Sequence, residues 1–339
     1  MPSKPLSELE AMVGEQRVTV EEFRIEAGKV EEFARAITEP NPIFRDEDVA
    51  REAGYEAIPA PLTYTRVGRF PRYRPDDVEG YGFDLGFEPE YVLHGEQSYE
   101  YERPLLVGDV LTGTTTLADV YQRDSRRAGT MTFAVHETAY RDENDELVLT
   151  ERATAIETEG AVDDGDGDDA GGEDGSGASA NGGTDVIDVD PSDSSADPES
   201  RVAAVSEVEV GDPGPTAVVE DLERRHFATY AGASGDFNPI HYDEPYARAA
   251  GNERVFGQGM FTAGVASRVV TDWFGLERID SFGVRFQSRV FPGDTIVATG
   301  EVADVDRDDG TVAVDIAVET PEGTTLLTGR SSATLSSGN

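Results

Sequence analysis

The chain shows the same order of helical and extended patterns twice. Near the start of each half, apolar side chains recur at the three- and four-residue spacing of a helix buried on one face. These side chains are Val30, Phe33, Ala34 and Ile37 in the first half, and Leu222, Phe227 and Tyr230 in the second. An apolar segment rich in small residues follows each of them, over residues 61–70 and 260–274. We expect this second segment to form a buried central helix.

Alternating apolar and polar residues then predict strands with one buried face. In the second half these segments span residues 281–290, 295–306, 311–319 and 324–335. The sequence ETPEGTT between the last two is typical of a hairpin turn. A central helix followed by a long antiparallel sheet is the α+β layout of a hot-dog fold. Small residues on the helix would let the sheet wrap closely around it.

The two halves also share sequence, which indicates an internal duplication. TEPNPIFRDEDVAREAGY in the first half resembles GDFNPIHYDEPYARAAGN in the second, and Asn41–Ile43 matches Asn238–Ile240 at an offset of 197 residues. Downstream, Gly108-Asp109 matches Gly293-Asp294, a pair that we interpret as a tight turn. The matches occur in the same order, so we divide the chain into two similar domains, 1–158 and 201–339.

The segment between them, residues 159–200, differs in composition from both. It holds 14 acidic residues, no basic residue and nine glycines, with few large apolar side chains. Such a segment buries too little surface to offset its ordering entropy, so we expect an acidic, disordered linker.

The net charge of the chain is −41, from 69 acidic and 28 basic residues. Without the 14 acidic residues of the linker, 55 acidic residues still face 28 basic ones. Charges of one sign repel in a compact state, and molar salt screens them by shortening the Debye length to about 3 Å. The excess therefore favours a high-salt cytoplasm and a halophilic archaeon-like source, with a plain acidic protein as the alternative.

Composition also narrows the classes of partner. We expect no nucleic acid, because no basic stripe is present to meet phosphates, and no membrane, because no apolar run is long enough to span one. The N-terminus lacks the pattern of a secretory leader, so we expect a cytoplasmic protein. With no cysteine and four histidines, we expect no metal and no other cofactor.

One segment carries residues suited to acid–base chemistry: Gly235-Asp236-Phe237-Asn238-Pro239-Ile240-His241. A carboxylate and an imidazole that face one water can transfer its protons, and histidine changes charge near neutral pH. Asp236 and His241 lie five residues apart across a loop that contains Pro239, so both can turn toward one point. Asn238 offers a donor and an acceptor that can hold the turn.

This segment resembles the hydratase signature of MaoC-like proteins, G-D-x-N-P-x-H, and the resemblance extends through most of residues 203–336. The first half resembles the dehydratase-like N-terminal domain of two-domain members. The resemblance implies a double hot-dog in which the halves form an intrachain pseudo-dimer around the substrate. It also implies a hydro-lyase of fatty acid metabolism that reversibly hydrates trans-2-enoyl-CoA to (R)-3-hydroxyacyl-CoA. The partner would be that thioester, and the resemblance leaves room for a homodimer of pseudo-dimers.

The family pattern also places an oxyanion donor at the start of the central helix, where backbone N–H groups lack partners. In GQGM the donor is the N–H of Gly259, and Gln258 stands where the family commonly has histidine. We expect Gln258 to alter the polarity of the acyl pocket. His94, His136 and His226 lack such a context, and we interpret them as surface or core residues.

The first half departs from the signature. Glu39 keeps a carboxylate, but Phe44 replaces the histidine, and Ala60-Pro61-Leu62 stands in place of GQGM. We therefore expect a degenerate site that has become an acyl-binding pocket. Two other functions remain open: an acyl-CoA thioesterase, which would carry its carboxylate on the central helix, and a non-catalytic acyl-thioester-binding protein. The acyl chain length, the carrier and the direction of the reaction also stay open.

Overall fold

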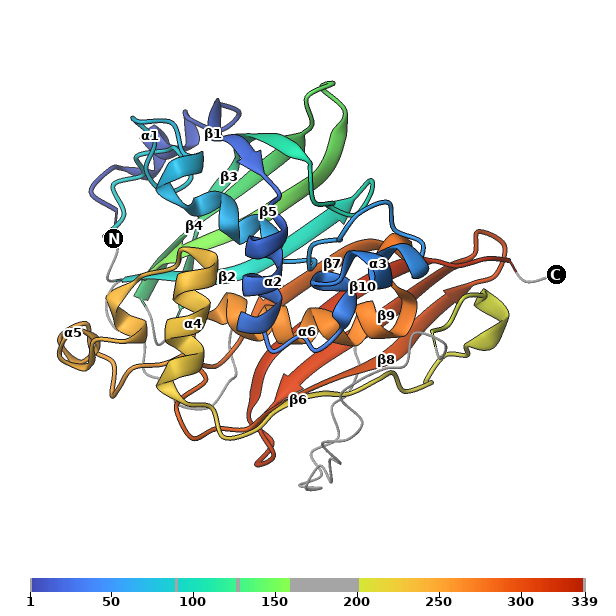
Figure 1. Ribbon diagram of the computed structural model, residues 1–339. Helices are drawn as coiled ribbons and strands as arrows, with labels where there is room; N and C mark the ends of the chain where they lie inside the picture. The colour runs from blue at the N-terminus through green and yellow to red at the C-terminus, as the bar shows by residue number, and fades with distance from the viewer. Residues whose placement is uncertain (1, 89–90, 126–128, 159–200, 338–339) are drawn as a thin grey trace.

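The computed structural model describes residues 2–88, 91–125, 129–158 and 201–337 (Figure 1). The expected acidic linker, 159–200, lies outside the described residues. The helices of the first half are α1 (Leu6–Glu10), α2 (Ala27–Ala36) and α3 (Glu47–Glu52), with short 3-10 helices η1 (Pro42–Phe44), η2 (Tyr64–Arg69) and η3 (Pro71–Tyr73). Its strands are β1 (Gln16–Arg24), β2 (Val92–Tyr101), β3 (Val110–Ser125), β4 (Gly129–Arg141) and β5 (Leu147–Glu157).

The second half repeats this order. Its helices are α4 (Arg224–Ser234), α5 (Glu244–Ala249) and α6 (Gly259–Phe274), with 3-10 helices η7 (Val205–Glu207), η8 (Pro239–His241) and η9 (Leu276–Arg278). Its strands are β6 (Ala217–Val219), β7 (Ile279–Phe286), β8 (Ile296–Asp306), β9 (Thr311–Glu319) and β10 (Thr325–Thr334). Among the described residues, no helix combines the length and apolar character needed to span a bilayer.

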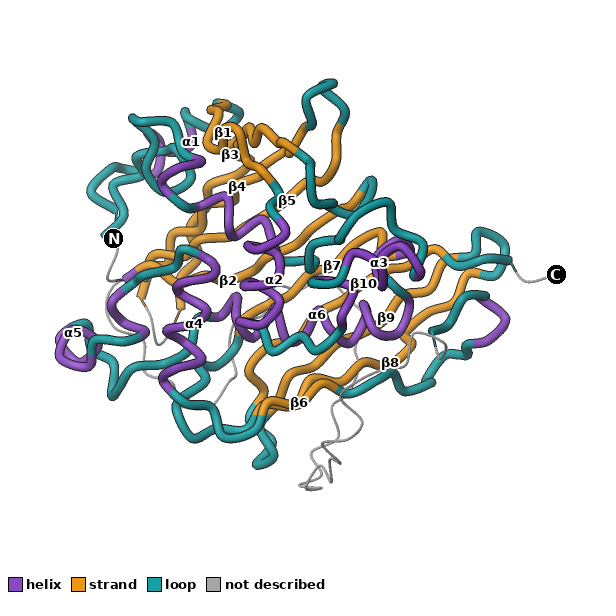
Figure 2. Tube along the Cα trace, in the orientation of Figure 1, coloured by secondary structure: helices purple, strands orange, loops and turns teal. Residues whose placement is uncertain are grey.

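The ten strands form one continuous antiparallel sheet in the order β1-β3-β4-β5-β2-β7-β10-β9-β8-β6. The first five strands come from the first half, and the last five repeat their arrangement in reverse. The halves join where β2 pairs with β7, from Glu96 opposite Arg285 to Glu100 opposite Ser281. The helices lie over one face of this sheet (Figure 2). The chain is therefore the expected pseudo-dimer, with the two sheets joined edge to edge.

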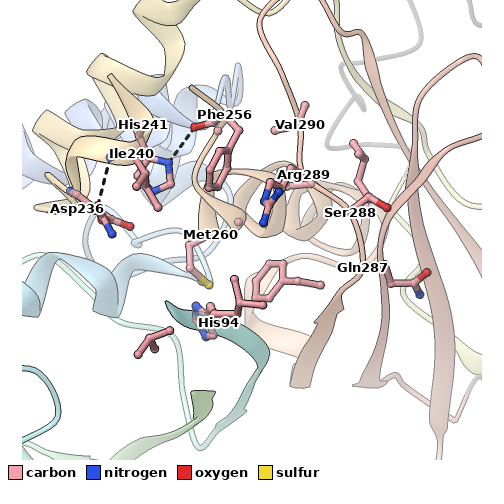
Figure 3. A pocket seen from close by; sticks show the side chains of 18 of the residues that line it. His94, Asp236, Ile240, His241, Phe256, Met260, Gln287, Ser288, Arg289 and Val290 are labelled. Carbon is pink, nitrogen blue, oxygen red and sulfur yellow. Dashed lines mark hydrogen bonds between the residues drawn. The ribbon is translucent and has the colours of Figure 1, made fainter. Parts of the chain in front are cut away.

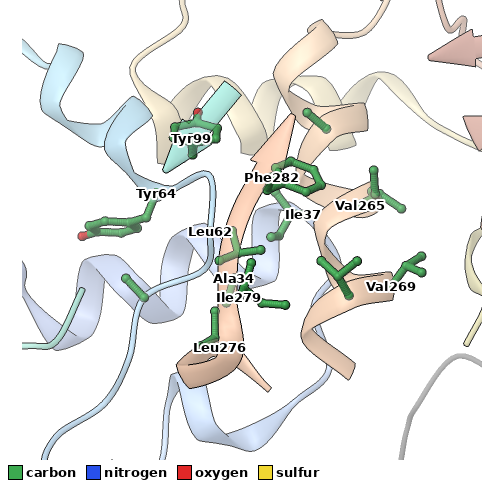
Figure 4. Close-up of a cluster of buried hydrophobic side chains, with 14 of the residues drawn as sticks. Ala34, Ile37, Leu62, Tyr64, Tyr99, Val265, Val269, Leu276, Ile279 and Phe282 are labelled. Carbon is green, nitrogen blue, oxygen red and sulfur yellow. The ribbon is translucent and has the colours of Figure 1, made fainter. Parts of the chain in front are cut away.

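Helix α6 is buried on all sides, from Met260 to Phe274. It packs on the strands of its own half and reaches residues of the other half in a shared core that includes Ile37, Leu62 and Phe282 (Figure 4). Gly264 allows a close approach to the first half, because a Cβ added there would lie 2.4 Å from Cγ2 of Ile37. The small residues of the segment thus serve contact between the halves as well as the wrapping of the sheet.

The central helix expected in the first half is much shorter than its counterpart. Residues 61–70 form loop and the 3-10 helix η2, and η3 follows directly. Pro61 and Pro71 bracket the segment, and a proline removes a donor from any longer helix and blocks the preceding turn. Helix α6 therefore occupies the centre without a helical partner of equal length.

The strand expected over residues 281–290 also ends early, at Phe286. The N–H groups of Gln287 and Ser288 both donate to the carbonyl of Leu326, at 2.9 and 3.2 Å, so the regular ladder stops there. The residues that follow turn away from the sheet and become part of a cavity wall.

The duplicated Gly-Asp pairs form matching turns, as predicted. Gly108 and Gly293 adopt positive φ angles of 107° and 97°, a conformation that favours glycine. Oδ2 of Asp109 accepts the N–H of Leu106 at 2.9 Å, and Oδ2 of Asp294 accepts the N–H of Phe291 at 2.8 Å.

The contact at Gly264 gives a test of how tightly the halves pack. Gly264→Ala should lower the free energy of unfolding by about 1–3 kcal/mol, because the added methyl overpacks a core that has no space for it. Gly28→Ala is the matched control, since no atom lies within 4 Å of the added Cβ. Denaturant unfolding measures both, and equal stability of the two variants would show that the contact with Ile37 relaxes freely.

Candidate active site

A cavity of about 410 Å³ lies between the two halves (Figure 3). Residues of both halves line it. The first half contributes Arg66, Tyr81, Val92, Leu93, His94 and Ala155. The second half contributes residues of the Gly-Asp-x-Asn-Pro-x-His segment, the start of α6 and the chain after β7, among them Asp236, Asn238, His241, Gly259, Met260 and Arg289. The four residues expected to form the site therefore meet at one cavity.

The segment that carries Asp236 is shaped by its local sequence. Helix α4 ends at Gly235, whose φ of 81° is left-handed and suits a residue without a Cβ. Oδ1 of Asn238 accepts the N–H of Ile240 at 3.2 Å, and Pro239 begins the 3-10 turn η8. Asn238 and Pro239 thus fix the short turn that separates Asp236 from His241, as predicted from the sequence.

His241 is buried, and its ring is held in one orientation. Nδ1 lies 2.8 Å from the carbonyl oxygen of Phe256, and this nitrogen must donate because a carbonyl only accepts. Nε2 is then the unprotonated nitrogen of a neutral ring. Burial lowers the pKa of His241, and the nearby Arg66 lowers it further, although Asp236 and the bond to Phe256 oppose the shift. The imidazole is therefore a neutral base at physiological pH.

Asp236 is the carboxylate of the cavity and stays partly open to it, with 23% of its side chain exposed. Its Oδ2 lies 3.6 Å from Nη2 of Arg66, which belongs to η2 of the first half. Asp236 and His241 enter the cavity from the same wall (Figure 3). A water molecule between them would meet a proton acceptor on each side.

Gly259 is the first residue of α6 and lines the same cavity. The N–H groups of a first helical turn lack partners within the helix, and the helix dipole favours negative charge there. A Cβ at this position would lie 3.1 Å from the ring of Phe286, so a side chain has little room. The backbone of Gly259 can therefore approach a ligand oxygen closely.

Gln258 has a different role from the one expected. It is buried and does not line the cavity. Its Nε2 donates to the carbonyls of Phe227, at 3.1 Å, and Asp236, at 3.4 Å. The expectation that Gln258 sets the polarity of the acyl pocket is wrong, because the side chain turns back to hold the loop of Asp236 against α4.

The corresponding loop of the first half keeps the same turn. Oδ1 of Asn41 accepts the N–H of Ile43 at 3.1 Å, as Asn238 does in the second half, and Glu39 accepts the N–H of Asn41 at 2.8 Å. Helix α6 packs against this loop, and Nη1 of Arg268 donates to Oγ1 of Thr38 at 2.9 Å. Side chains of α6 therefore contact this loop, and neither Glu39 nor Asn41 lines the cavity at Asp236.

Three histidines were interpreted as surface or core residues, and one of them is not. His136 is buried and stacks on Tyr81 with ring centres 4.3 Å apart, and Nδ1 of His226 accepts the N–H of Glu223 at 2.9 Å. His94 instead lines the cavity from β2. Burial and the nearby Arg66 lower the pKa of His94 to about 4, so it is neutral. It lies within an ordinary strand pattern, which gives no signal of this role.

Arg66 is a second cavity residue that the sequence did not single out. It lies in η2, after the Ala60-Pro61-Leu62 that stands in place of GQGM, and nothing in the local pattern there indicates a site. No group of three or more His, Asp or Glu side chains within the described ranges gathers in a way that could hold a metal ion.

Both halves match known families. Residues 204–323 match the MaoC like domain, and residues 11–151 match the FAS1-like dehydratase domain region. A UPF0336 protein of Thermobifida fusca is 37% identical over 105 residues, which are 30% of this chain and 64% of that protein. A UPF0336 protein of Streptomyces avermitilis is 30% identical over 111 residues, 33% of this chain and 72% of that protein. The match to the Thermobifida fusca protein thus spans less than two thirds of its length.

Solved structures show the same fold. A MaoC-like dehydratase has a TM-score of 0.72 at 24% identity and covers 97% of this chain and 100% of its own. A MaoC-like dehydratase from Phytophthora capsici has a TM-score of 0.63 at 21% identity, covering 98% and 99%. A Mycobacterium tuberculosis protein described as a double hotdog has a TM-score of 0.61 at 17% identity, covering 98% of each chain.

The chain therefore belongs to the family of UPF0336 proteins and carries two MaoC-like dehydratase domains on a double hot-dog fold. The two domain matches are to dehydratase families, which supports a hydratase or dehydratase role in general. The relatives come from actinobacteria and lend no support to the expected halophilic archaeal source.

The stability of the protein should depend on pH through two buried carboxyl groups, those of Glu39 and Asp272, which lie close together at the loop of Glu39. Burial and the neighbouring Glu39 raise the pKa of Asp272, on α6, to about 7, although Arg268 and Arg201 limit the rise. Burial likewise raises the pKa of Glu39, against the effect of Arg268. The folded state then binds protons more tightly than the unfolded state between about pH 4 and 7. Stability from this source is present at low pH and is lost as the pH rises through 7.

Asp272→Asn should therefore flatten the fall in stability between pH 5 and 8, and the variant should exceed wild type at pH 8. Each unit of pKa difference is worth about 1.4 kcal/mol, so the effect should be on the order of a few kcal/mol. Denaturant unfolding at several pH values measures it, with the exposed Asp48→Asn as control. An unchanged slope in Asp272→Asn would mean that Asp272 is ionised throughout this range.

Proposed function

We propose that this protein reversibly hydrates trans-2-enoyl thioesters to (R)-3-hydroxyacyl thioesters, with Asp236 and His241 acting on water. The observation that carries the proposal is the meeting of a neutral imidazole, a carboxylate and a helix N-terminus at one cavity. These are the groups that the reaction needs. A base removes a proton from water, and a donor stabilises negative charge on the thioester oxygen.

The proposed reaction runs without a cofactor. Asp236 holds the water, and Nε2 of His241 takes a proton as the water oxygen bonds to the β-carbon. The electron pair of the double bond moves toward the thioester oxygen, where the N–H of Gly259 stabilises the charge. A proton then returns to the α-carbon, so the net change is the addition of one water. The reverse sequence is a dehydration.

A CoA carrier is supported by a cationic group at the cavity. Arg289 lines the cavity with its guanidinium 5.0 Å from the ring centre of Phe256. In a chain of net charge −41, an arginine at the cavity favours an anionic ligand. We therefore propose an enoyl-CoA substrate. An acyl-binding role for the first half remains part of the proposal, since Val92, Leu93 and Ala155 supply apolar lining.

A thioesterase would carry its carboxylate on the central helix near the reacting carbonyl. The first turn of α6 has no acidic residue, and Asp272 in its last turn lies buried beside the loop of Glu39. The arrangement therefore favours the hydratase over the thioesterase.

Removal of either proposed acid–base group tests the assignment. Asp236→Asn and His241→Ala should each lower kcat on crotonyl-CoA by about 10²–10⁴, the usual contribution of a positioned acid or base. Glu39→Gln is the matched control, because its carboxyl lies outside the cavity, and its turnover should stay within a few-fold of wild type. Steady-state kinetics on folded variants decide the question. Near-normal kcat in Asp236→Asn or His241→Ala, or loss of activity in Glu39→Gln, would contradict the division between the halves.

We also propose that the charge of the chain is an adaptation to a concentrated-salt cytoplasm. Raising KCl from 0.1 to 2 M should raise the thermal midpoint by several degrees, because the Debye length falls from about 10 Å to below 3 Å and like charges stop repelling. Calorimetry at fixed pH measures the shift. A midpoint that is flat or falls with salt would leave the acidity without this explanation.

A further inference from the structure

Arg66 is a cation that the first half places beside the proposed catalytic carboxylate of the second. It lies on η2 and lines the cavity together with Asp236 and His241. Only 14% of its side chain is exposed, and its Nη2 lies 3.6 Å from Oδ2 of Asp236. This is the ion pair that Asp236 makes within the described part of the chain.

The surroundings of Arg66 favour its charged form. Burial lowers the pKa of Arg66, but Asp236, with smaller contributions from Tyr81, Tyr230 and Glu151, raises it well above its ordinary value. Nε of Arg66 has no hydrogen-bond partner among the described residues, so the guanidinium is not held by a full set of bonds to its own half. Its charge is instead balanced across the boundary between the halves.

We propose that Arg66 is a positioning residue of the active site, whose guanidinium holds the side chain of Asp236 in place beside His241 at the cavity. The proposal rests on the proposed hydratase function and deepens it. The first half then contributes to the chemistry as well as to acyl binding, although it has lost its own histidine.

The charges around His241 explain why Arg66 matters for a base. Asp236 is the anion near the ring and favours its protonated form, whereas Arg66 on η2 opposes that effect. His94 on β2 is neutral; Arg66 also lowers its pKa, whereas Glu151 and Asp236 raise it. Without Arg66, the charge that opposes the effect of Asp236 on His241 would be absent. The pKa of the His241 ring would then be higher.

Two neutral variants and one charged variant test this. In Arg66→Gln and Arg66→Met, kcat for crotonyl-CoA at pH 7 should fall 10- to 100-fold with KM changed less than threefold. The acidic limb of kcat/KM should move up by roughly one pH unit, because these variants remove a neighbouring like charge that disfavours protonation of His241. Arg66→Lys keeps the positive charge. It should therefore retain most of the wild-type kcat, and the acidic limb of its kcat/KM profile should lie at the wild-type pH. Arg72→Gln is the matched control, because Arg72 is exposed and pairs with Glu26 away from the cavity.

A second readout does not depend on turnover. The ring ¹⁵N signals of the four histidines can be titrated, and the signal missing from His241→Ala identifies His241. Its pKa should be higher in Arg66→Gln than in wild type. If the wild-type protein is inactive on every enoyl-CoA, the proposed function is wrong. The titration would still show whether Arg66 lowers the pKa of His241. An unchanged pKa of His241, a change in KM alone, or failure of both neutral variants to fold would overturn the positioning role.

Discussion

The antiparallel pairing of β2 with β7 is the interaction on which the rest of the structure depends. It joins two copies of one fold into a single ten-stranded sheet and brings their helical faces together. The cavity exists only because of this junction, since its walls come from β2 and η2 on one side and from η8, α6 and the end of β7 on the other. Either half alone would leave Asp236 and His241 open to water on one side.

The duplication then explains why the two halves diverged. Asn41 and Asn238 form the same turn, yet one turn leads to Phe44 in the core and the other to His241 in the cavity. One long helix, α6, occupies the centre, and it fills the space beside Glu39 with Arg268 and Asp272. Two equal sites would each need open space at that centre. The single long helix is therefore consistent with one site, and the first half supplies Arg66 to it across the boundary.

Much of the fold and of the site could be predicted from the sequence, because strand alternation and the spacing of the motif residues are local patterns. Strand alternation gave β8, β9 and β10 to within one residue at each end, and the spacing of Asp236, Asn238 and His241 indicated one turn. The rest depends on which residues meet across the junction. Arg66 and His94 lie in segments that look like ordinary core, and only the pairing of the halves brings them to the cavity. The direction of Gln258 and the early end of β7 likewise follow from tertiary hydrogen bonds.

The central claim is that the cavity adds water to an enoyl thioester, and the product of one reaction tests it most directly. The protein would be incubated with crotonyl-CoA in molar KCl, and the products separated by chiral chromatography. The account predicts (R)-3-hydroxybutyryl-CoA with its thioester intact. Release of free CoA, formation of the (S) product, or unchanged crotonyl-CoA would contradict it.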